Sequence, residues 1–253
     1  MLKLCVLFSV TLWPMLSQGK DSRNQNDSTS NPNSNFVEAD YAFARQNAVM
    51  KSTDGLTATI NTSNATIMRI ISKFDLADHV FMKAKGERME ARYKDLDALT
   101  PMDVKGTSTF FDLGFGTSVS KDMNLGASVF YLKRASTHTS PDIINEYLET
   151  GLKLDAEYFF NFNEKNLIQF CGSLGMPTSY KETENRSGYF YYGYLGQAEA
   201  LLVSHITHWQ TVGIGLGFRN VTNQFAGLGD QNTNEASISQ TDLYIPITLR
   251  INF

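Results

Sequence analysis

Large apolar side chains recur at every second position along much of the chain, most clearly at its C-terminus. Successive side chains of an extended strand point to opposite faces, so this period of two predicts a strand with one wholly apolar face. The half-buried strand of a soluble sheet has the same period, so the segment alone leaves both interpretations open. The apolar series is Leu243, Ile245, Ile247, Leu249, Ile251 and Phe253.

The same alternation returns in the segments 111–119, 125–131, 151–162 and 210–219, where mostly charged residues, glycine or serine occupy the second face. About ten residues are enough for a tilted strand to cross a bilayer. Because hydrocarbon contains no water, backbone amides there must pair internally, and a β-chain achieves this by closing its sheet. The pattern predicts an all-β protein, a closed antiparallel transmembrane β-barrel, with a soluble β-sandwich as the alternative.

The connections between these segments alternate in length. The long ones are 94–104, 135–146, 177–188 and 220–240, and the short ones are 72–78, 120–122, 163–165 and 204–208. Outer-membrane barrels have short periplasmic turns and longer external loops, so both termini of the mature chain are predicted on the periplasmic side. The predicted strands are 36–50, 57–71, 79–93, 105–119, 123–134, 147–162, 166–176, 189–203, 209–219 and 241–253.

Three features complicate this count of ten strands. The segments 36–50 and 57–71 mix apolar and polar residues on both faces, and the connection 51–56 is short where a long one is expected. Eight to twelve strands therefore remain open. Pro246 lies inside the last strand and has no N–H to donate, which predicts a bulge or a lumenal irregularity there.

Aromatic residues gather near both ends of the predicted strands, as in the girdles at the two membrane interfaces. The external group is Tyr189, Phe190, Tyr191, Tyr192 and Tyr194, and the periplasmic group is Tyr158, Phe160, Phe162, Trp209 and Phe253.

The N-terminus has the features of an export signal. Lys3 precedes an apolar run from Leu4 to Leu16, and Ser17 and Gly19 provide small residues before a cleavage site, so 1–19 are predicted as a signal peptide. Residues 20–35 are almost entirely polar and predict a disordered leader. The barrel would occupy 36–253. Because Cys5 belongs to the signal peptide, Cys171 would remain without a disulfide partner.

The last strand, 243–253, resembles the C-terminal strand of Gram-negative outer-membrane β-barrels, which ends in an aromatic residue. The signal peptide, polar leader and barrel without a large passenger are similar to solitary autotransporter-type barrels. The resemblance implies an outer-membrane location, contact with membrane lipid, and recognition of Leu249, Ile251 and Phe253 by the barrel-assembly machinery.

The polar face of each strand is predicted to line the lumen. Its charged residues include Asp112, Lys153, Asp155, Glu157, Glu199, Arg219, Asp242 and Arg250, together with Lys83, Lys85 and Glu87. Their signs nearly balance, and a barrel of about ten strands is narrow, so ion pairs across a packed lumen are favoured over a narrow polar pore. The lumenal glycines Gly114, Gly116, Gly213, Gly215 and Gly217 fit either alternative.

The sequence gives few indications of a catalytic or ligand-binding site. The formal net charge is -4 and the basic residues are scattered, which excludes a nucleic-acid partner. The spacing of His205 and His208 does not predict a metal site, and no cofactor or catalytic residue is predicted. The hypotheses are a structural or surface-interaction barrel with an unknown external ligand, a narrow porin-like channel, and a hydrolase at the external rim. The candidate hydrolase residues are Asp95, Asp97, His138, Asp142 and Asp230.

Overall fold

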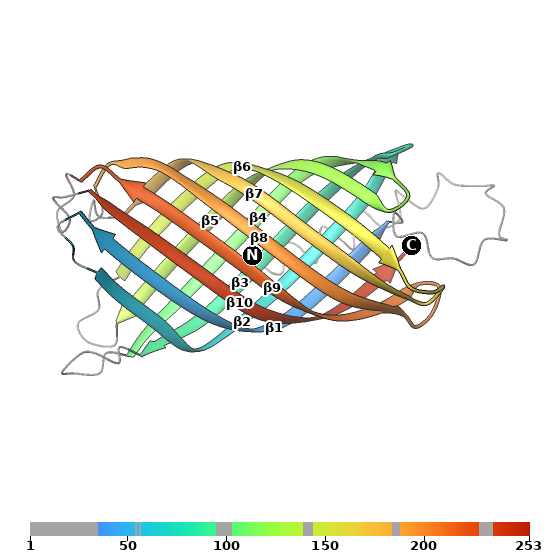
Figure 1. Ribbon diagram of the computed structural model, residues 1–253, viewed down its shortest axis with the longest axis horizontal. Coiled ribbons are helices and arrows are strands. Elements are labelled where there is room, and N and C mark those ends of the chain that lie inside the picture. Colours follow the sequence, from blue (N-terminus) through green and yellow to red (C-terminus); the bar gives the residue numbers. More distant parts are fainter. Residues whose placement is uncertain are drawn as a thin grey trace. The chain divides into compact units, whose positions relative to one another are not determined.

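The computed structural model describes residues 35–53, 55, 57–94, 103–138, 144–183, 188–227 and 235–253. These residues form ten strands: β1 (Phe36–Ser52), β2 (Thr57–Ala77), β3 (Val80–Lys94), β4 (Asp103–Ser120), β5 (Met123–His138), β6 (Ile144–Asn161), β7 (Asn166–Glu182), β8 (Phe190–His205), β9 (Gln210–Phe225) and β10 (Ala236–Asn252). Each strand pairs antiparallel with its neighbours along the chain, and β1 pairs with β10 (Figure 1). The predicted closed antiparallel barrel is confirmed.

The predicted signal peptide and all of the predicted leader except Asn35 lie outside the described residues. Within the described part of the chain, no helix is long and apolar enough to cross a membrane.

The two ends of the barrel differ in their connections. At one end, here called the terminal end, the Phe253 N–H donates to the Asn35 carbonyl at 3.0 Å, and the turns 78–79, 121–122, 162–165 and 206–209 are short. The opposite loop end carries the connections 53–56, 95–102, 139–143, 183–189 and 226–235. Gly55, with φ of 90°, makes the first of these a tight turn. The alternation of short and long connections is therefore confirmed, with 53–56 as its exception.

Several strands continue further toward the loop end than predicted. β7 runs to Glu182 instead of residue 176, β9 runs to Phe225 instead of 219, and β10 begins at Ala236 instead of 241. At the terminal end, β2 runs to Ala77 instead of 71. The loop-end extensions are polar on their outward face, and the prediction ended these strands where that face stops being apolar.

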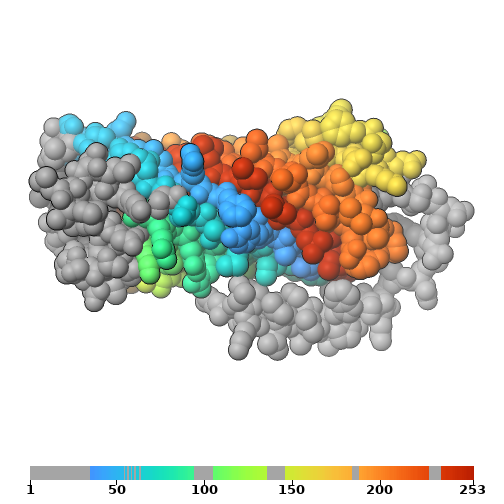
Figure 2. Space-filling view, turned by 90° about the horizontal axis from the view of Figure 1, so that it is seen from below, coloured from blue at the N-terminus to red at the C-terminus, as the bar shows by residue number. Residues whose placement is uncertain are grey.

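Exposed apolar side chains cover the outer wall from the terminal end to a sharp edge on most strands. On β4 the outward series Phe115, Leu113 and Phe111 gives way to Thr109 and Thr107. This outward apolar surface is here called the belt, and its edge lies at Phe43, Phe111, Leu152, Met176, Phe218 and Leu243. In Figure 2 the blue β1 and red β10 run diagonally side by side on this wall. The part of the barrel between the belt and the loop end is called the rim.

A local irregularity explains the mixed faces of β2. The register of β1 with β2 shifts between Ala44 and Asn47, and that of β2 with β3 shifts between Thr62 and Asn64. A bulge inverts the phase of the inward and outward positions that follow it. Pro246 produces no such shift: the register of β10 with β9 is the same on both sides of it, and only the pairs at Ile245 and Pro246 are missing. The predicted irregularity is thus a gap in the ladder, without a bulge.

The predicted external girdle divides between the two faces. Tyr191 and Tyr192 are exposed, whereas Phe190 packs against Phe225 with ring centroids 6.1 Å apart. The register of β8 with β9 shifts between Phe190 and Tyr192, which moves Phe190 away from the outward face. Tyr158, Phe160, Phe162, Trp209 and Phe253 are all exposed toward the terminal end.

Candidate functional site: the charged lumen

The charged residues predicted for the lumen lie inside the barrel. Seven are buried, namely Asp112, Lys153, Glu157, Glu199, Arg219, Asp242 and Arg250, and Asp155 is half-buried. Each charge needs a partner of opposite sign, because an unpaired ion in a medium of low dielectric constant carries a large desolvation cost. The partners come both from neighbouring strands and from strands across the lumen.

Arg69 of β2 forms the central group. Its Nη1 and Nη2 donate to the two Glu199 carboxylate oxygens of β8 at 2.8 and 2.9 Å, and its Nε donates to Asp40 of β1. This fork geometry suits guanidinium, whose planar donors match a carboxylate two at a time. One arginine thereby joins three strands across the lumen.

Arg219 of β9 forms a second group nearer the loop end. Its Nε donates to Asp242 at 2.8 Å, and its Nη1 is paired with Glu87 of β3. Gln46 also donates to Asp242, at 2.6 Å, so this carboxylate is held from two sides. Toward the terminal end Arg250 pairs with Glu38 at 2.6 Å and donates to Gln169 at 2.8 Å.

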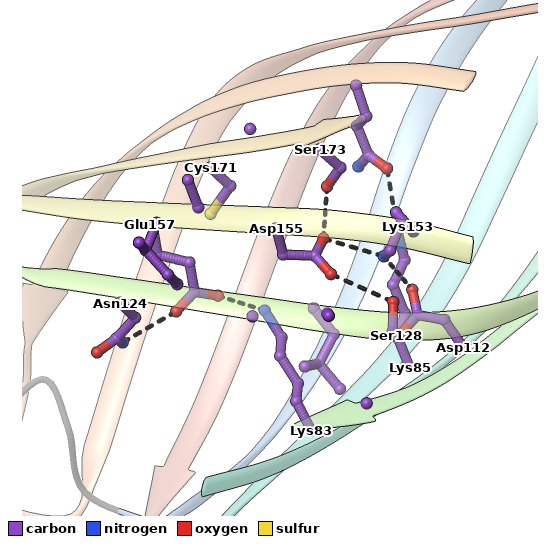
Figure 3. A pocket seen from close by; sticks show the side chains of 18 of the residues that line it. Lys83, Lys85, Asp112, Asn124, Ser128, Lys153, Asp155, Glu157, Cys171 and Ser173 are labelled. Atoms are coloured by element: carbon purple, nitrogen blue, oxygen red, sulfur yellow. Dashed lines mark hydrogen bonds and ion pairs between the residues drawn. The ribbon is translucent and has the colours of Figure 1, made fainter. Parts of the chain in front are cut away.

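A further group of ion pairs surrounds a small cavity on the β4–β7 side (Figure 3). Lys153 pairs with Asp112 and, at 3.1 Å, with Asp155, while Lys83 pairs with Glu157. The cavity has a volume of about 60 Å³. Since one water needs roughly 10–15 Å³ of such volume, it has room for only a few waters.

Apolar and aromatic side chains fill the lumen between these groups. Phe110 and Phe130 stack with centroids 5.8 Å apart, in a cluster with Leu132, Leu195 and Val221. The ring of Tyr244 lies where a side chain at Gly217 would be, and that of Phe81 lies where one at Gly116 would be. The lumenal glycines therefore make room for bulky residues of other strands.

Sequence analysis missed several members of this network. Asp40 belongs to β1 and Arg69 to β2, where a bulge at 62–64 shifts the alternation. Lys73 is also buried, with its Nζ 4.3 Å from the centroid of the Phe81 ring and no hydrogen-bond acceptor among the described residues. Alternation counted from the bulge of β2 would have placed Arg69 and Lys73 on the lumenal face, and the regular alternation of 36–46 in β1 would have placed Asp40 there.

The predicted assembly signal lies on the outer wall. Leu249, Ile251 and Phe253 are exposed, and all three belong to the belt at the terminal end. The ring of Phe253 lies 6.1 Å from that of Phe74 on β2.

Among the described residues, no group of three His, Cys, Asp or Glu side chains could hold a metal ion. The His205 ring interacts with Thr211 Oγ1 at 3.0 Å. Of the predicted rim residues, Asp95, Asp97, Asp142, Asp230 and the His138 side chain lie outside the described part, so the hydrolase hypothesis stays a prediction.

No protein-family model and no curated protein sequence matches the chain. Its structure is similar to that of the outer membrane protease OmpT from Escherichia coli, with a TM-score of 0.52 and 10% identity over 88% of this chain and 98% of that one. The fold is that of an outer-membrane β-barrel. At this low identity the likeness of the barrel to OmpT concerns the fold alone.

Two other similar structures have lower TM-scores. The translocator domain of the autotransporter NalP from Neisseria meningitidis has a TM-score of 0.43 and 8% identity, covering 98% of this chain and 96% of that one. Neisserial surface protein A has a TM-score of 0.34 and 15% identity, covering 87% of this chain and 97% of that one.

Proposed function

We propose that this barrel is a closed outer-membrane protein with a structural or surface-interaction role, and that it does not conduct solutes. The observation that carries the proposal is the network of ion pairs across the lumen, centred on Arg69 and Arg219. Each of these arginines joins carboxylates of two other strands. An ion that crossed the lumen would have to displace these buried pairs.

The width of the barrel supports this interpretation. Interior width grows with strand number, and barrels of eight strands are essentially filled by side chains, whereas sixteen or more leave an aqueous channel. Ten strands lie near the filled end of this range, and aromatic rings occupy the space that Gly116 and Gly217 leave. The buried pairs are weak evidence for extra stability, because desolvation offsets much of their attraction. Their supported role is to fill and close the lumen.

Different parts of the outer wall are proposed to contact different partners. The belt would contact membrane lipid, and its terminal strand with Leu249, Ile251 and Phe253 would be read by the barrel-assembly machinery. The rim projects past the belt and carries polar outward residues such as Thr107 and Asn220. We therefore assign contacts with external partners to the rim and to the loop end.

Planar-bilayer recording tests the closed lumen. The purified barrel should give no stepwise currents, whereas the triple variant Asp40→Ala, Arg69→Ala, Glu199→Ala should give them if it folds, because it removes the central group. A Lys133→Gln variant serves as the control, since Lys133 pairs with Glu146 at 2.8 Å on the outer wall. Stepwise currents from the unaltered barrel would overturn the proposal and favour the narrow channel.

A further inference from the structure

The wall of the rim is split between two neighbouring strands. The pairing of β7 with β8 ends at Gly175 and Leu195 within the described residues, although β7 continues to Glu182 and β8 begins at Phe190. Over the same stretch β7 stays paired with β6, up to Glu182, and β8 stays paired with β9, down to Phe190. This break in the ladder, between 176–182 of β7 and 190–194 of β8, is here called the seam.

The sequence explains why the ladder stops there. Pro177 has no N–H and cannot donate to a neighbouring strand. Gly193, on the opposite side of the seam, has no side chain, and a Cβ at this position would lie 3.2 Å from Pro177 Cγ and against the Asn223 side-chain oxygen. The Asn223 side chain of β9 thus occupies the space beside Gly193 of β8 on the lumenal side.

Aromatic rings bridge the seam in place of backbone hydrogen bonds. Tyr180 of β7 stacks on Phe190 of β8 with centroids 5.6 Å apart, and Phe190 contacts Phe225 of β9. Tyr147 of β6 stacks on Tyr180 at 5.3 Å. Ring contacts can separate and re-form by side-chain rotation, whereas a paired ladder must lose several hydrogen bonds at once. The wall therefore opens most easily at this position.

Three buried polar atoms without partners lie on the lumenal side of the same part of the rim. Glu149 of β6 is fully buried and accepts a hydrogen bond from Asn223 Nδ2 at 2.6 Å, but its second carboxylate oxygen has no partner. The Asn223 side-chain oxygen and Arg134 Nε are also without partners. Buried polar groups are almost always hydrogen-bonded, so three orphan atoms in one region make it a candidate site for a polar ligand.

We propose that the seam admits a small amino-acid-like zwitterion to a site formed by Glu149, Asn223 and Arg134. The ligand's ammonium group would donate to the free Glu149 and Asn223 oxygens, and its carboxylate would accept from Arg134 Nε. Its apolar part would lie against the rings of Tyr180 and Phe190.

The three orphan atoms select this class of ligand. Two are acceptors and one is a donor, which matches a molecule that carries both an ammonium group and a carboxylate. Arg134 also lies over the Tyr147 ring, 5.8 Å from its centroid, and this fixed positive charge disfavours a simple amine. Glu149 disfavours a simple carboxylate for the opposite reason.

Saturation-transfer NMR on the detergent-solubilised barrel tests the site with three probes of similar shape: L-leucine, isoamylamine and 4-methylpentanoate. Leucine should bind more tightly than either probe that lacks one of its charges. Glu149→Gln should weaken leucine binding about tenfold or more, because a hydrogen bond to a charged group is lost. Arg134→Gln should bring leucine down to the affinity of isoamylamine.

Lys133→Gln is the matched control, because Lys133 neighbours Arg134 on the same strand and faces outward; it should leave leucine binding unchanged. Each variant must keep the heat-modifiable gel migration of the folded barrel. A variant that loses this migration is replaced by Asn223→Asp, which keeps the size of the side chain and should also change leucine affinity. The proposal is overturned if leucine does not bind, or if all three probes bind equally. A buried water at the three atoms would give the first of these results.

Hydrogen exchange tests the seam separately from the ligand. Amides of 176–182 and 190–194 that point into the seam should exchange faster than those of 167–175, and leucine should slow them. Equal protection of amides from exchange on both sides of Gly175 would overturn the proposal that the wall opens at the seam. The site is independent of the closed lumen, so a conducting barrel would overturn the proposed function and leave leucine binding as it is.

Discussion

Replacing Arg69 with Met should destabilise the barrel more than any other single change of a lumenal charge. Arg69 and its partners are almost completely buried, with side-chain exposures of 4% for Arg69 and Glu199 and 2% for Asp40. Methionine preserves most of the volume but leaves two carboxylates facing each other without a cation. Removing one partner of a buried pair costs about 3–5 kcal/mol in the free energy of unfolding. Because Arg69 is shared by two carboxylates, the loss in this variant should lie near the upper limit of that range.

Urea unfolding of the barrel in detergent micelles, followed by tryptophan fluorescence, measures this loss. The triple variant Asp40→Asn, Arg69→Met, Glu199→Gln is the decisive comparison, because it removes all three charges. The free energy of unfolding of the triple variant should lie within about 1–2 kcal/mol of that of the unaltered barrel. The reason is that neutral amides carry a much smaller desolvation cost than carboxylates. If Arg69→Met alone costs less than about 1 kcal/mol, or if the triple variant is no more stable than the single one, the account of the lumen as a paired network is refuted.

Three further changes test other parts of the structure. In the ligand-free barrel, burial raises the pKa of Glu149 in the rim. The folded barrel should therefore lose stability as the pH rises above the ordinary glutamate value, and Glu149→Gln should flatten this decline in urea titrations from pH 4 to 9. Gly217→Val should cost about 1–3 kcal/mol, because its Cβ would collide with the buried Tyr244 ring, whereas Gly196→Ala, in open space, should stay within about 0.5 kcal/mol. Leu154→Arg, at a belt position that is 65% exposed, should cost about 2–4 kcal/mol for barrels folded into lipid vesicles, and no loss there would exclude lipid from this face.

The belt could be predicted because the membrane constrains every second residue of a spanning strand. Along 243–253 and 151–162 the outward positions have to be apolar, so their period is visible without any knowledge of the neighbouring strands. The short turns were predictable for a related reason, since few residues separate the apolar series on either side of them.

The rim was harder to predict because no such constraint acts there. β7 continues past Met176 with Thr178 and Lys181 on its outer side, and alternation of polar with polar residues carries no signal. The bulge of β2 hid Arg69 in a different way, by changing the phase of the pattern within the strand.

Partners across the lumen cannot be derived from periodicity. The pattern indicates that Arg219 and Glu199 face inward, but not that Arg219 meets Glu87 of β3 while Glu199 meets Arg69 of β2. Those contacts depend on the closure of the barrel and on the stagger of its strands. The orphan atoms of Glu149 and Asn223 likewise become visible only when every neighbour is in place.

Spin labels placed one at a time at positions 242–251, in barrels folded into lipid vesicles, test the central claim most directly. Labels at 243, 245, 247, 249 and 251 should be strongly relaxed by oxygen dissolved in the acyl chains. Labels at the intervening positions should be shielded from oxygen and from a water-soluble nickel complex alike, because their face of β10 is packed. Uniform accessibility along the strand, or strong relaxation by nickel at the lumenal positions, would contradict a lipid-facing belt around a closed lumen.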